Sequence, residues 1–201
     1  VDRPEERLLT LRDFPDATPG DTTQVLRRLT YSPDGQWLAA AVMSLHPSVQ
    51  AGIWIVPANG GTPRRTTSKD ANALQASWSP DGKSMAIQLW DRLSIVGIGS
   101  GETRRVATPA PAVFRHLEWS PTGKWIAANW WRPGTPSTAV LIDPTTGVVR
   151  EFEDFSAPPA YAWAPDGKTV YGVFLTDTGS ELRALDVASG RVRAVAKYTT
   201  R

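Results

Sequence analysis

The sequence predicts an all-β fold built from a repeated unit, and three observations lead to this prediction. A short polar turn with an aromatic residue before it occurs four times in 201 residues. An apolar segment of strand length follows each copy of the turn. No segment of useful length shows the 3.6-residue spacing of apolar side chains that an amphipathic helix requires.

The repeated turn is centred on a proline. The four copies read YSPDGQW (31–37), WSPDGKS (78–84), WSPTGKW (119–125) and WAPDGKT (163–169). Proline presets the first turn position, aspartate accepts hydrogen bonds from the turn, and glycine takes the left-handed conformation. Thr122 replaces the aspartate in the third copy, and Ala164 replaces the serine in the fourth, so we expect weaker capping there. We expect the aromatic residue before each turn to pack against a neighbouring unit.

Each unit contains further strand-like segments in the same order. A first strand follows the turn at 37–42, 84–89, 125–130 and 169–174. A second follows at 52–57, 93–98, 138–143 and 181–186, and then a glycine turn and a basic strand at 59–67, 99–107, 145–153 and 188–196. The motif prolines recur every 41 to 47 residues, a period typical of propeller blades. The sequence therefore predicts a β-propeller of four-stranded antiparallel blades.

We place the four blades at about 25–68, 69–108, 109–154 and 155–197, within a domain that covers 25–201. The preceding residues, 1–24, form an N-terminal segment. Its residues 7–14 alternate like a strand and are a candidate outer strand of a missing or partner blade.

Composition excludes several classes of function. The chain has no cysteine, so disulfides and thiolate chemistry are excluded. The net charge is only +2 and the basic residues are scattered, so we expect no nucleic-acid partner. No apolar run approaches the roughly 20 residues of a membrane-spanning helix, and the first residues have no signal-peptide hydrophobic region.

The four turns and the strands after them resemble the PD40, or TolB-like, β-propeller repeat, whose core reads W-S-P-D-G-K followed by an apolar strand. The resemblance covers about residues 25–197. It implies a non-catalytic module that binds a protein or peptide partner in a periplasmic or other extracytoplasmic compartment, although a cytoplasmic location stays open. The alternative is a substrate-gating domain of a larger hydrolase, a prolyl-oligopeptidase-like serine peptidase or an amidohydrolase, whose catalytic domain is not in this chain.

Propellers of this family usually have six or more blades, whereas four are visible here. Unpaired end blades would expose strand edges and apolar faces. Three outcomes are therefore open: the chain is a piece of a longer propeller, it closes with four blades, or a homodimer completes the ring.

We predict no catalytic residues, no metal site and no cofactor. The sequence lacks G-x-S-x-G, H-E-x-x-H and any cysteine pair. The glycine-rich GIGSGE (97–102) aligns with the other hairpin turns, so we expect a plain hairpin rather than a phosphate loop. A self-contained enzyme would need converging ionisable groups on the innermost strands, which supply only Arg28, His116 and Glu118.

Binding is expected on the face that carries the irregular loops and at the mouth of the central channel. The candidate binding residues are Trp130, Trp131, Arg132, Arg115, His116, Trp90 and Arg92. Each also has a structural interpretation: one tryptophan in the core, a hydrogen-bonded structural histidine, and a surface ion pair of Asp91 with Arg92. His46 is expected to have no role. The doublets Arg64–Arg65 and Arg104–Arg105 are expected to form a solvated rim.

Overall fold

The computed structural model describes residues 24–44, 52–68, 71–90, 92–108, 113–155, 158 and 160–199, with side chains from residue 28 onward apart from 43 and 44. In this part of the chain the backbone forms four antiparallel sheets of four strands each. The predicted all-β fold with four-stranded blades is therefore confirmed. Apart from Gln24, the predicted N-terminal segment lies outside the described residues, as do His46 and Asp91.

Each sheet is one blade, and consecutive strands are neighbours within it. Blade 1 contains β1 (Gln24–Tyr31), β2 (Trp37–Ser44), β3 (Gly52–Pro57) and β4 (Arg64–Arg65). Blade 2 contains β5 (Ala73–Trp78), β6 (Ser84–Leu89), β7 (Leu93–Gly97) and β8 (Thr103–Arg105). Blade 3 contains β9 (Val113–Trp119), β10 (Ile126–Trp131), β11 (Thr138–Ile142) and β12 (Val149–Phe152), followed by the 3-10 helix η2 (Glu153–Phe155). Blade 4 contains β13 (Tyr161–Trp163), β14 (Thr169–Thr176), β15 (Gly179–Asp186) and β16 (Val192–Thr199).

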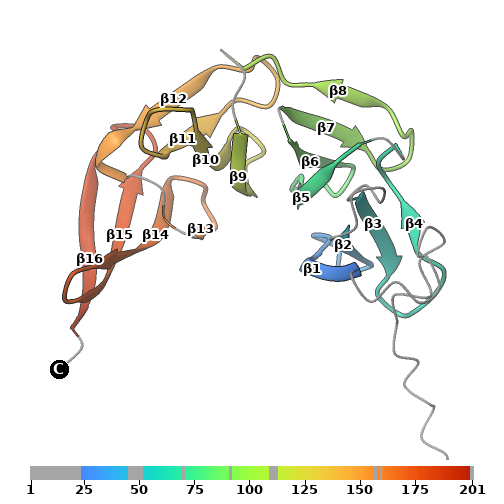
Figure 1. Ribbon diagram of the computed structural model, residues 1–201, viewed down its shortest axis with the longest axis horizontal. Helices are drawn as coiled ribbons and strands as arrows, with labels where there is room; N and C mark the ends of the chain where they lie inside the picture. The colour runs from blue at the N-terminus through green and yellow to red at the C-terminus, as the bar shows by residue number, and fades with distance from the viewer. Residues whose placement is uncertain are drawn as a thin grey trace, which may run out of the picture.

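The blades are arranged in an open arc (Figure 1). The first strands of the blades, β1, β5, β9 and β13, line the concave side, and the fourth strands lie on the convex side. Blade 1 and blade 4 are the two ends of the arc and lie apart. No helix in the described part of the chain is long and apolar enough to cross a membrane.

The motif turns have the predicted chemistry. In the second turn, Ser79 Oγ donates a hydrogen bond to Asp81 at 2.6 Å, and the backbone N–H of Lys83 donates to the same carboxylate oxygen at 3.0 Å. Gly82 has a φ of 68°, the left-handed conformation that glycine adopts without strain. The GIGSGE segment is a hairpin turn that leads into β8, as expected.

Apolar side chains fill the junctions between consecutive blades. One cluster joins Ala39 and Ile53 of blade 1 to Met85 of blade 2. A second contains residues of blades 2 and 3, and a third contains residues of blades 3 and 4. Burial of apolar area at these junctions is the main source of stability in a repeat fold of this kind.

The aromatic residues before the turns also connect the blades. The indole N–H of Trp78 donates to the carbonyl of Thr30 in blade 1, and that of Trp163 donates to the carbonyl of Glu118 in blade 3. Trp119 bonds the carbonyl of Gly123 in its own turn instead. Tyr31 belongs to blade 1, the first of the described blades, and its side chain is exposed.

Candidate functional site

In the first three blades, the inner strand pairs irregularly with the second strand. The register shifts at Arg28 in β1, at Leu74 in β5 and at His116 in β9. Arg28 and His116 have φ values of 43° and 56°, which only a few per cent of residues other than glycine adopt. A β-bulge re-aims a side chain, and such strained residues are frequent at functional sites. The concave side of the arc therefore carries features typical of a functional site.

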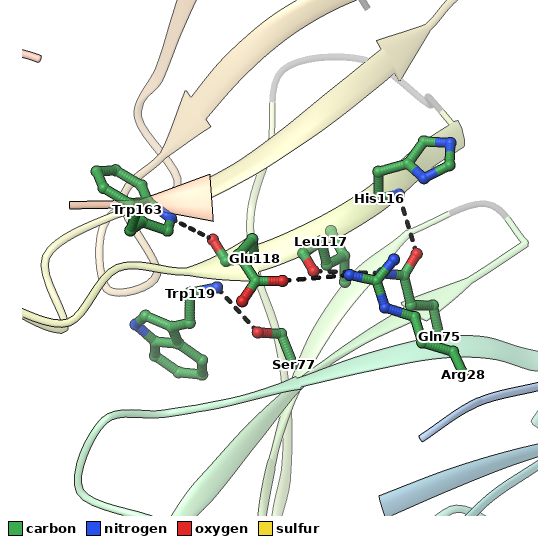
Figure 2. Close-up of polar contacts among 8 residues, drawn as sticks. All are labelled: Arg28, Gln75, Ser77, His116, Leu117, Glu118, Trp119 and Trp163. Atoms are coloured by element: carbon green, nitrogen blue, oxygen red, sulfur yellow. Dashed lines mark hydrogen bonds and ion pairs between the residues drawn. The ribbon is translucent and has the colours of Figure 1, made fainter. Parts of the chain in front are cut away.

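The irregular strands bring four polar side chains together, which we call the inner-strand cluster: Arg28, Gln75, His116 and Glu118 (Figure 2). Arg28, Gln75 and His116 occupy equivalent positions, five residues before the motif proline of blades 1, 2 and 3. The Arg28 guanidinium donates to the Glu118 carboxylate at 3.2 Å, so this ion pair joins blade 1 to blade 3.

Gln75 bridges blades 2 and 3 with both ends of its amide. Its Nε2 donates to the carbonyl of Leu117 at 3.2 Å, and its Oε1 accepts from the backbone N–H of His116 at 2.9 Å. The backbone N–H of Trp119 donates to Ser77 Oγ two residues further along the same pair of strands. The buried Gln75 therefore fixes the irregular backbone that presents His116 and Glu118.

Burial and the two arginines set the charges of the cluster. Burial raises the pKa of the Glu118 carboxyl, and the neighbouring Arg28 opposes that rise. Burial lowers the pKa of His116, and the positive charges of Arg28 and Arg115 lower it further. His116 is therefore neutral at pH 7, and its environment disfavours a second positive charge beside Arg28.

The cluster offers groups that can bind a polar ligand. It contains an ion pair, an amide and an imidazole whose pKa is lowered. Arg28 and Glu118 have 35% and 36% of their side chains exposed, so the pair is open to a ligand from the concave side. Among the described residues, no three His, Asp or Glu side chains lie close enough together to hold a metal ion.

A hollow of about 420 Å³ lies beside Glu118 at the turn end of the inner strands. Its lining repeats along the arc, since blades 1 to 3 each contribute the motif proline and the aromatic residue before it. These residues are Tyr31, Pro33, Trp78, Pro80, Trp119 and Pro121. The hollow is thus an aromatic and proline-lined mouth that leads to the ion pair.

The predicted binding residues at the end of β10 have divided roles. Trp130 is buried in the junction of blades 2 and 3 and stacks on Phe114, with ring centroids 5.9 Å apart. The Arg132 guanidinium lies 4.3 Å from the centre of the Trp130 ring and donates two hydrogen bonds to Glu151, at 2.8 and 3.2 Å. Trp131 points to the opposite side of the strand and is exposed.

The exposed Trp131 has counterparts on its neighbours. Trp90 and Leu175 occupy the equivalent positions in blades 2 and 4, ten residues after the motif proline, and both are exposed. We call Trp90, Trp131 and Leu175 the apolar row. The row lies on the loop face, the end of the blades that carries the connections between second and third strands. Arg115 is also exposed, and it pairs with Asn129 two residues before Trp131.

Arg92 lies in the same short connection as Trp90, where the Arg92 carbonyl accepts the N–H of Leu89. Of the seven predicted binding residues, six have a side chain that is at least partly open to solvent: Trp90, Trp131, Arg92, Arg115, His116 and Arg132. Trp130 is in the core, and the Arg132 guanidinium is engaged by Glu151 and Trp130.

Sequence reasoning missed two features. Gln75 was not among the predicted residues, and only its position five residues before the motif proline links it to Arg28 and His116. Arg64 and Arg104 are exposed, as expected for a solvated rim, but each also donates a hydrogen bond to the next blade, Arg64 to the Ile98 carbonyl and Arg104 to the Pro144 carbonyl. The pairing of β-strands, which the sequence does not state, decides both features.

No family model matches the chain, and no curated protein matches it by sequence. The chain is similar to the solved structure of a protein assigned as TolB from Agrobacterium tumefaciens, with 24% identity and a TM-score of 0.66, over 85% of this chain and 65% of that one. It is similar to a puromycin hydrolase S511A mutant complexed with PGG, with 18% identity and a TM-score of 0.68, over 88% and 29% of the chains.

A third similar structure comes from a nidogen/laminin complex, with 13% identity, a TM-score of 0.69, and 87% and 66% of the chains covered. At these identities the likeness shows the fold. The predicted TolB-like β-propeller fold is confirmed, and the chain spans less than two thirds of the length of the TolB and hydrolase structures.

Proposed function

We propose that the chain is a non-catalytic β-propeller module that binds a protein or peptide partner on its loop face. The apolar row carries this proposal: Trp90, Trp131 and Leu175 are large, exposed and placed at equivalent positions on three consecutive blades. Exposed apolar surface of this kind marks interaction sites, and tryptophan is enriched among the residues that dominate binding energy.

The chemistry around the row also supports a peptide-like partner. Arg115 and Arg92 add positive charge near the tryptophans, because Arg115 pairs with Asn129, two residues before Trp131, and Arg92 is two residues after Trp90. Strands hold Trp131, Leu175 and Arg115, so little conformational entropy of these groups is lost on binding. The likeness to a chain of a nidogen/laminin complex agrees with a protein-binding role for a propeller of this shape.

The test is selection from a random peptide library on the immobilised chain, followed by calorimetry with the enriched peptides. We expect the double substitution Trp90→Ala and Trp131→Ala to weaken binding by about tenfold or more. Val148→Ala is the matched control, since Val148 is an exposed apolar residue in the turn before β12, at the other end of the blades. Unchanged affinity in the double variant, or an equal loss in the control, contradicts the proposal.

A second candidate function is the substrate-gating domain of a larger hydrolase, and the likeness to the puromycin hydrolase favours it. The chain covers 29% of that protein, so a hydrolase role would require catalytic residues encoded outside these 201 residues. The sequence of the complete gene separates the two functions. A G-x-S-x-G segment or a histidine-rich metal motif beyond the propeller would favour the gating role.

We also propose an extracytoplasmic, periplasmic location, which the resemblance to TolB-like repeats and the absence of cysteine support. We further propose that the chain associates with a second copy of itself. The open arc supports this, because blade 1 and blade 4 each have one side that none of the other described blades covers.

A further inference from the structure

We infer that the third turn of blade 2, between β7 and β8, binds a carboxylate group of a ligand. This inference is independent of the proposed peptide binding on the loop face, because the turns between third and fourth strands lie at the other end of the blades. Blade 2 lies between blades 1 and 3 in the arc, and apolar clusters join it to both of them (Figure 1). The equivalent turns of blades 3 and 4 provide the template for the site.

In blade 3, an aspartate side chain occupies the third turn. The backbone N–H groups of Thr145 and Thr146 donate to one carboxylate oxygen of Asp143, at 2.7 and 3.0 Å. The hydrogen bonds, above all that of the Thr146 N–H, and the nearby charge of Lys124 lower the pKa of the Asp143 carboxyl, although desolvation opposes them. This turn therefore stabilises a carboxylate in its charged form.

The third turn of blade 4 holds a carboxylate in the same way. The hydroxyl and the backbone N–H of Ser189 both donate to one oxygen of Asp186, at 2.6 and 2.7 Å. These two bonds, the hydroxyl first, lower the pKa of Asp186, and the backbone N–H of Ala188 adds a smaller effect. Two consecutive backbone N–H groups and a serine hydroxyl thus form a complete set of carboxylate donors.

Blade 2 keeps this turn but has no acidic side chain at its first position. All three turns close with the same backbone hydrogen bond, in which the turn glycine donates to the carbonyl of the residue four positions earlier, at 2.8 or 2.9 Å. That residue is Asp143 in blade 3, Asp186 in blade 4 and Gly97 in blade 2. Gly99 and Ser100 therefore correspond to the residues that supply the backbone donors in the other two turns.

The donors of the blade 2 turn have no acceptor among the described residues. Neither the backbone N–H of Gly99 nor that of Ser100 donates to any of them. Ser100 Oγ accepts the N–H of Glu102 at 3.2 Å, and its own hydrogen has no acceptor in the described chain. A Cβ added at Gly97 would lie 2.5 Å from Ser100 Oγ. The hydroxyl is therefore at the place where the aspartate side chain begins in the other blades.

Positive charge and open space lie beside these donors. The backbone N–H of Ile98 donates to the carbonyl of Lys83 at 2.9 Å, which fixes this lysine next to the turn, at the position of Lys124 in blade 3. A hollow of about 940 Å³ opens there, and Lys83, Ser100 and Arg104 are among its lining residues. A carboxylate fills only a small part of this volume, so the hollow can also accommodate the molecule that carries it.

The lining favours a single carboxylate over a phosphate group. Glu102 also lines the hollow, and its negative charge opposes a ligand with two charges. The Arg104 guanidinium already donates to the carbonyl of Pro144, at 2.7 Å. The acidic side chain of a polypeptide and a free organic acid share the carboxylate that the turn would recognise, and the experiment distinguishes these two sources.

The test is NMR titration of the full chain at constant ionic strength, with acetate, with the blocked peptide acetyl-Gly-Asp-Gly-amide and with inorganic phosphate. Both carboxylates should shift the amide signals of Gly99 and Ser100 to lower field, because those N–H groups gain an acceptor. The amides of Thr145, Thr146 and Ser189 are the matched control, since each already bonds an aspartate. Tighter binding of the peptide than of acetate identifies a polypeptide source, and equal affinities identify a free acid.

Three variants test the donor set. Gly97→Asp should abolish the response, because the introduced carboxylate occupies the site from within the chain, whereas Gly97→Ala should retain it. Ser100→Ala should weaken binding by about tenfold, as expected for the loss of a hydrogen bond to a charged group. Asp143→Gly should make the amides of Thr145 and Thr146 respond to added carboxylate. Circular dichroism shows whether each variant is folded, and Ser100→Ala keeps the test decisive if Gly97→Asp is not.

The remaining outcomes overturn the inference. Signals of Gly99 and Ser100 that do not move, or that move no more than those of the control turns, show that the turn is not a site. A response that persists in folded Gly97→Asp places the ligand elsewhere. Tighter binding of phosphate than of acetate contradicts the assigned ligand class. None of these results bears on the loop face, because the apolar row is at the opposite end of the blades.

Discussion

The guanidinium of Arg28 lies 3.2 Å from the carboxylate of Glu118, although the two residues belong to the first and third blades. Beside the pair, Gln75 of blade 2 accepts a hydrogen bond from the backbone N–H of His116 in blade 3. The ion pair therefore joins blades 1 and 3 on the concave side, and the charge of Arg28 lowers the pKa of both Glu118 and His116, next to the larger effect of burial on each.

Removing Arg28 should shift two titrations in a known direction. In Arg28→Ala, the pKa of Glu118 should rise further, because Arg28 is the group that opposes the effect of burial. The pKa of His116 should rise too, because a neighbouring positive charge is lost. NMR titration measures both. Arg115→Ala is the control, since it should move the pKa of His116 and leave that of Glu118 in place.

His116 should make the protein less stable in mild acid. Its pKa is lowered in the folded state, so the unfolded chain binds more protons as the pH falls below the ordinary value of 6.5. The free energy of unfolding should therefore decrease from that pH downward. His116→Asn, which tolerates the same backbone conformation, should flatten this decrease in urea unfolding between pH 8 and 5. An identical pH profile in the variant would exclude His116 as its cause.

Alanine substitutions at Arg132 and Trp131 should have different effects on the free energy of unfolding. Arg132→Ala removes two hydrogen bonds to Glu151 and the contact with the Trp130 ring, so we expect a loss of about 1–2 kcal/mol in the free energy of unfolding. Trp131→Ala removes an exposed side chain and should cost less than about 1 kcal/mol. A larger loss for Trp131→Ala in chemical denaturation would make Trp131 a packing residue.

Substitution by alanine at two equivalent turn glycines should lower the free energy of unfolding by clearly different amounts. Gly101 and Gly147 have φ values of 68° and 76°, so alanine at either position carries the left-handed strain of about 1–2 kcal/mol. A Cβ at Gly101 would meet no atom within 4 Å, whereas one at Gly147 would lie 2.1 Å from the Ala107 carbonyl oxygen of the preceding blade. Gly147→Ala should therefore cost clearly more in urea unfolding. Equal costs would contradict the close approach of the two blades.

Local patterns made the fold predictable. The motif turns depend on residues within a few positions of one another, as the contacts of Asp81 with Ser79 and Lys83 show. Because each turn motif is a contiguous stretch of sequence, its recurrence was enough to predict the repeated unit. The blades' four-stranded meander follows from the same spacing.

The candidate site was less predictable because it depends on register. Arg28, Gln75 and His116 have different functional groups, so their sequence does not mark them as one site. The β-bulges of the paired strands bring them together. Adjacent tryptophans of a strand must point to opposite sides, so one of Trp130 and Trp131 had to be buried. Which one is buried depends on the side on which blade 2 packs, and the sequence of β10 does not contain that information.

The contacts between blades use backbone carbonyls of Ile98, Pro144 and Val187, three residues with unrelated side chains. Recognition at a junction is therefore indifferent to the identity of the residue that accepts the bond. In a blade gained by gene duplication, the backbone acceptor of this hydrogen bond would therefore already be in place. Only the apolar side chains at the new boundary would have to be matched to one another.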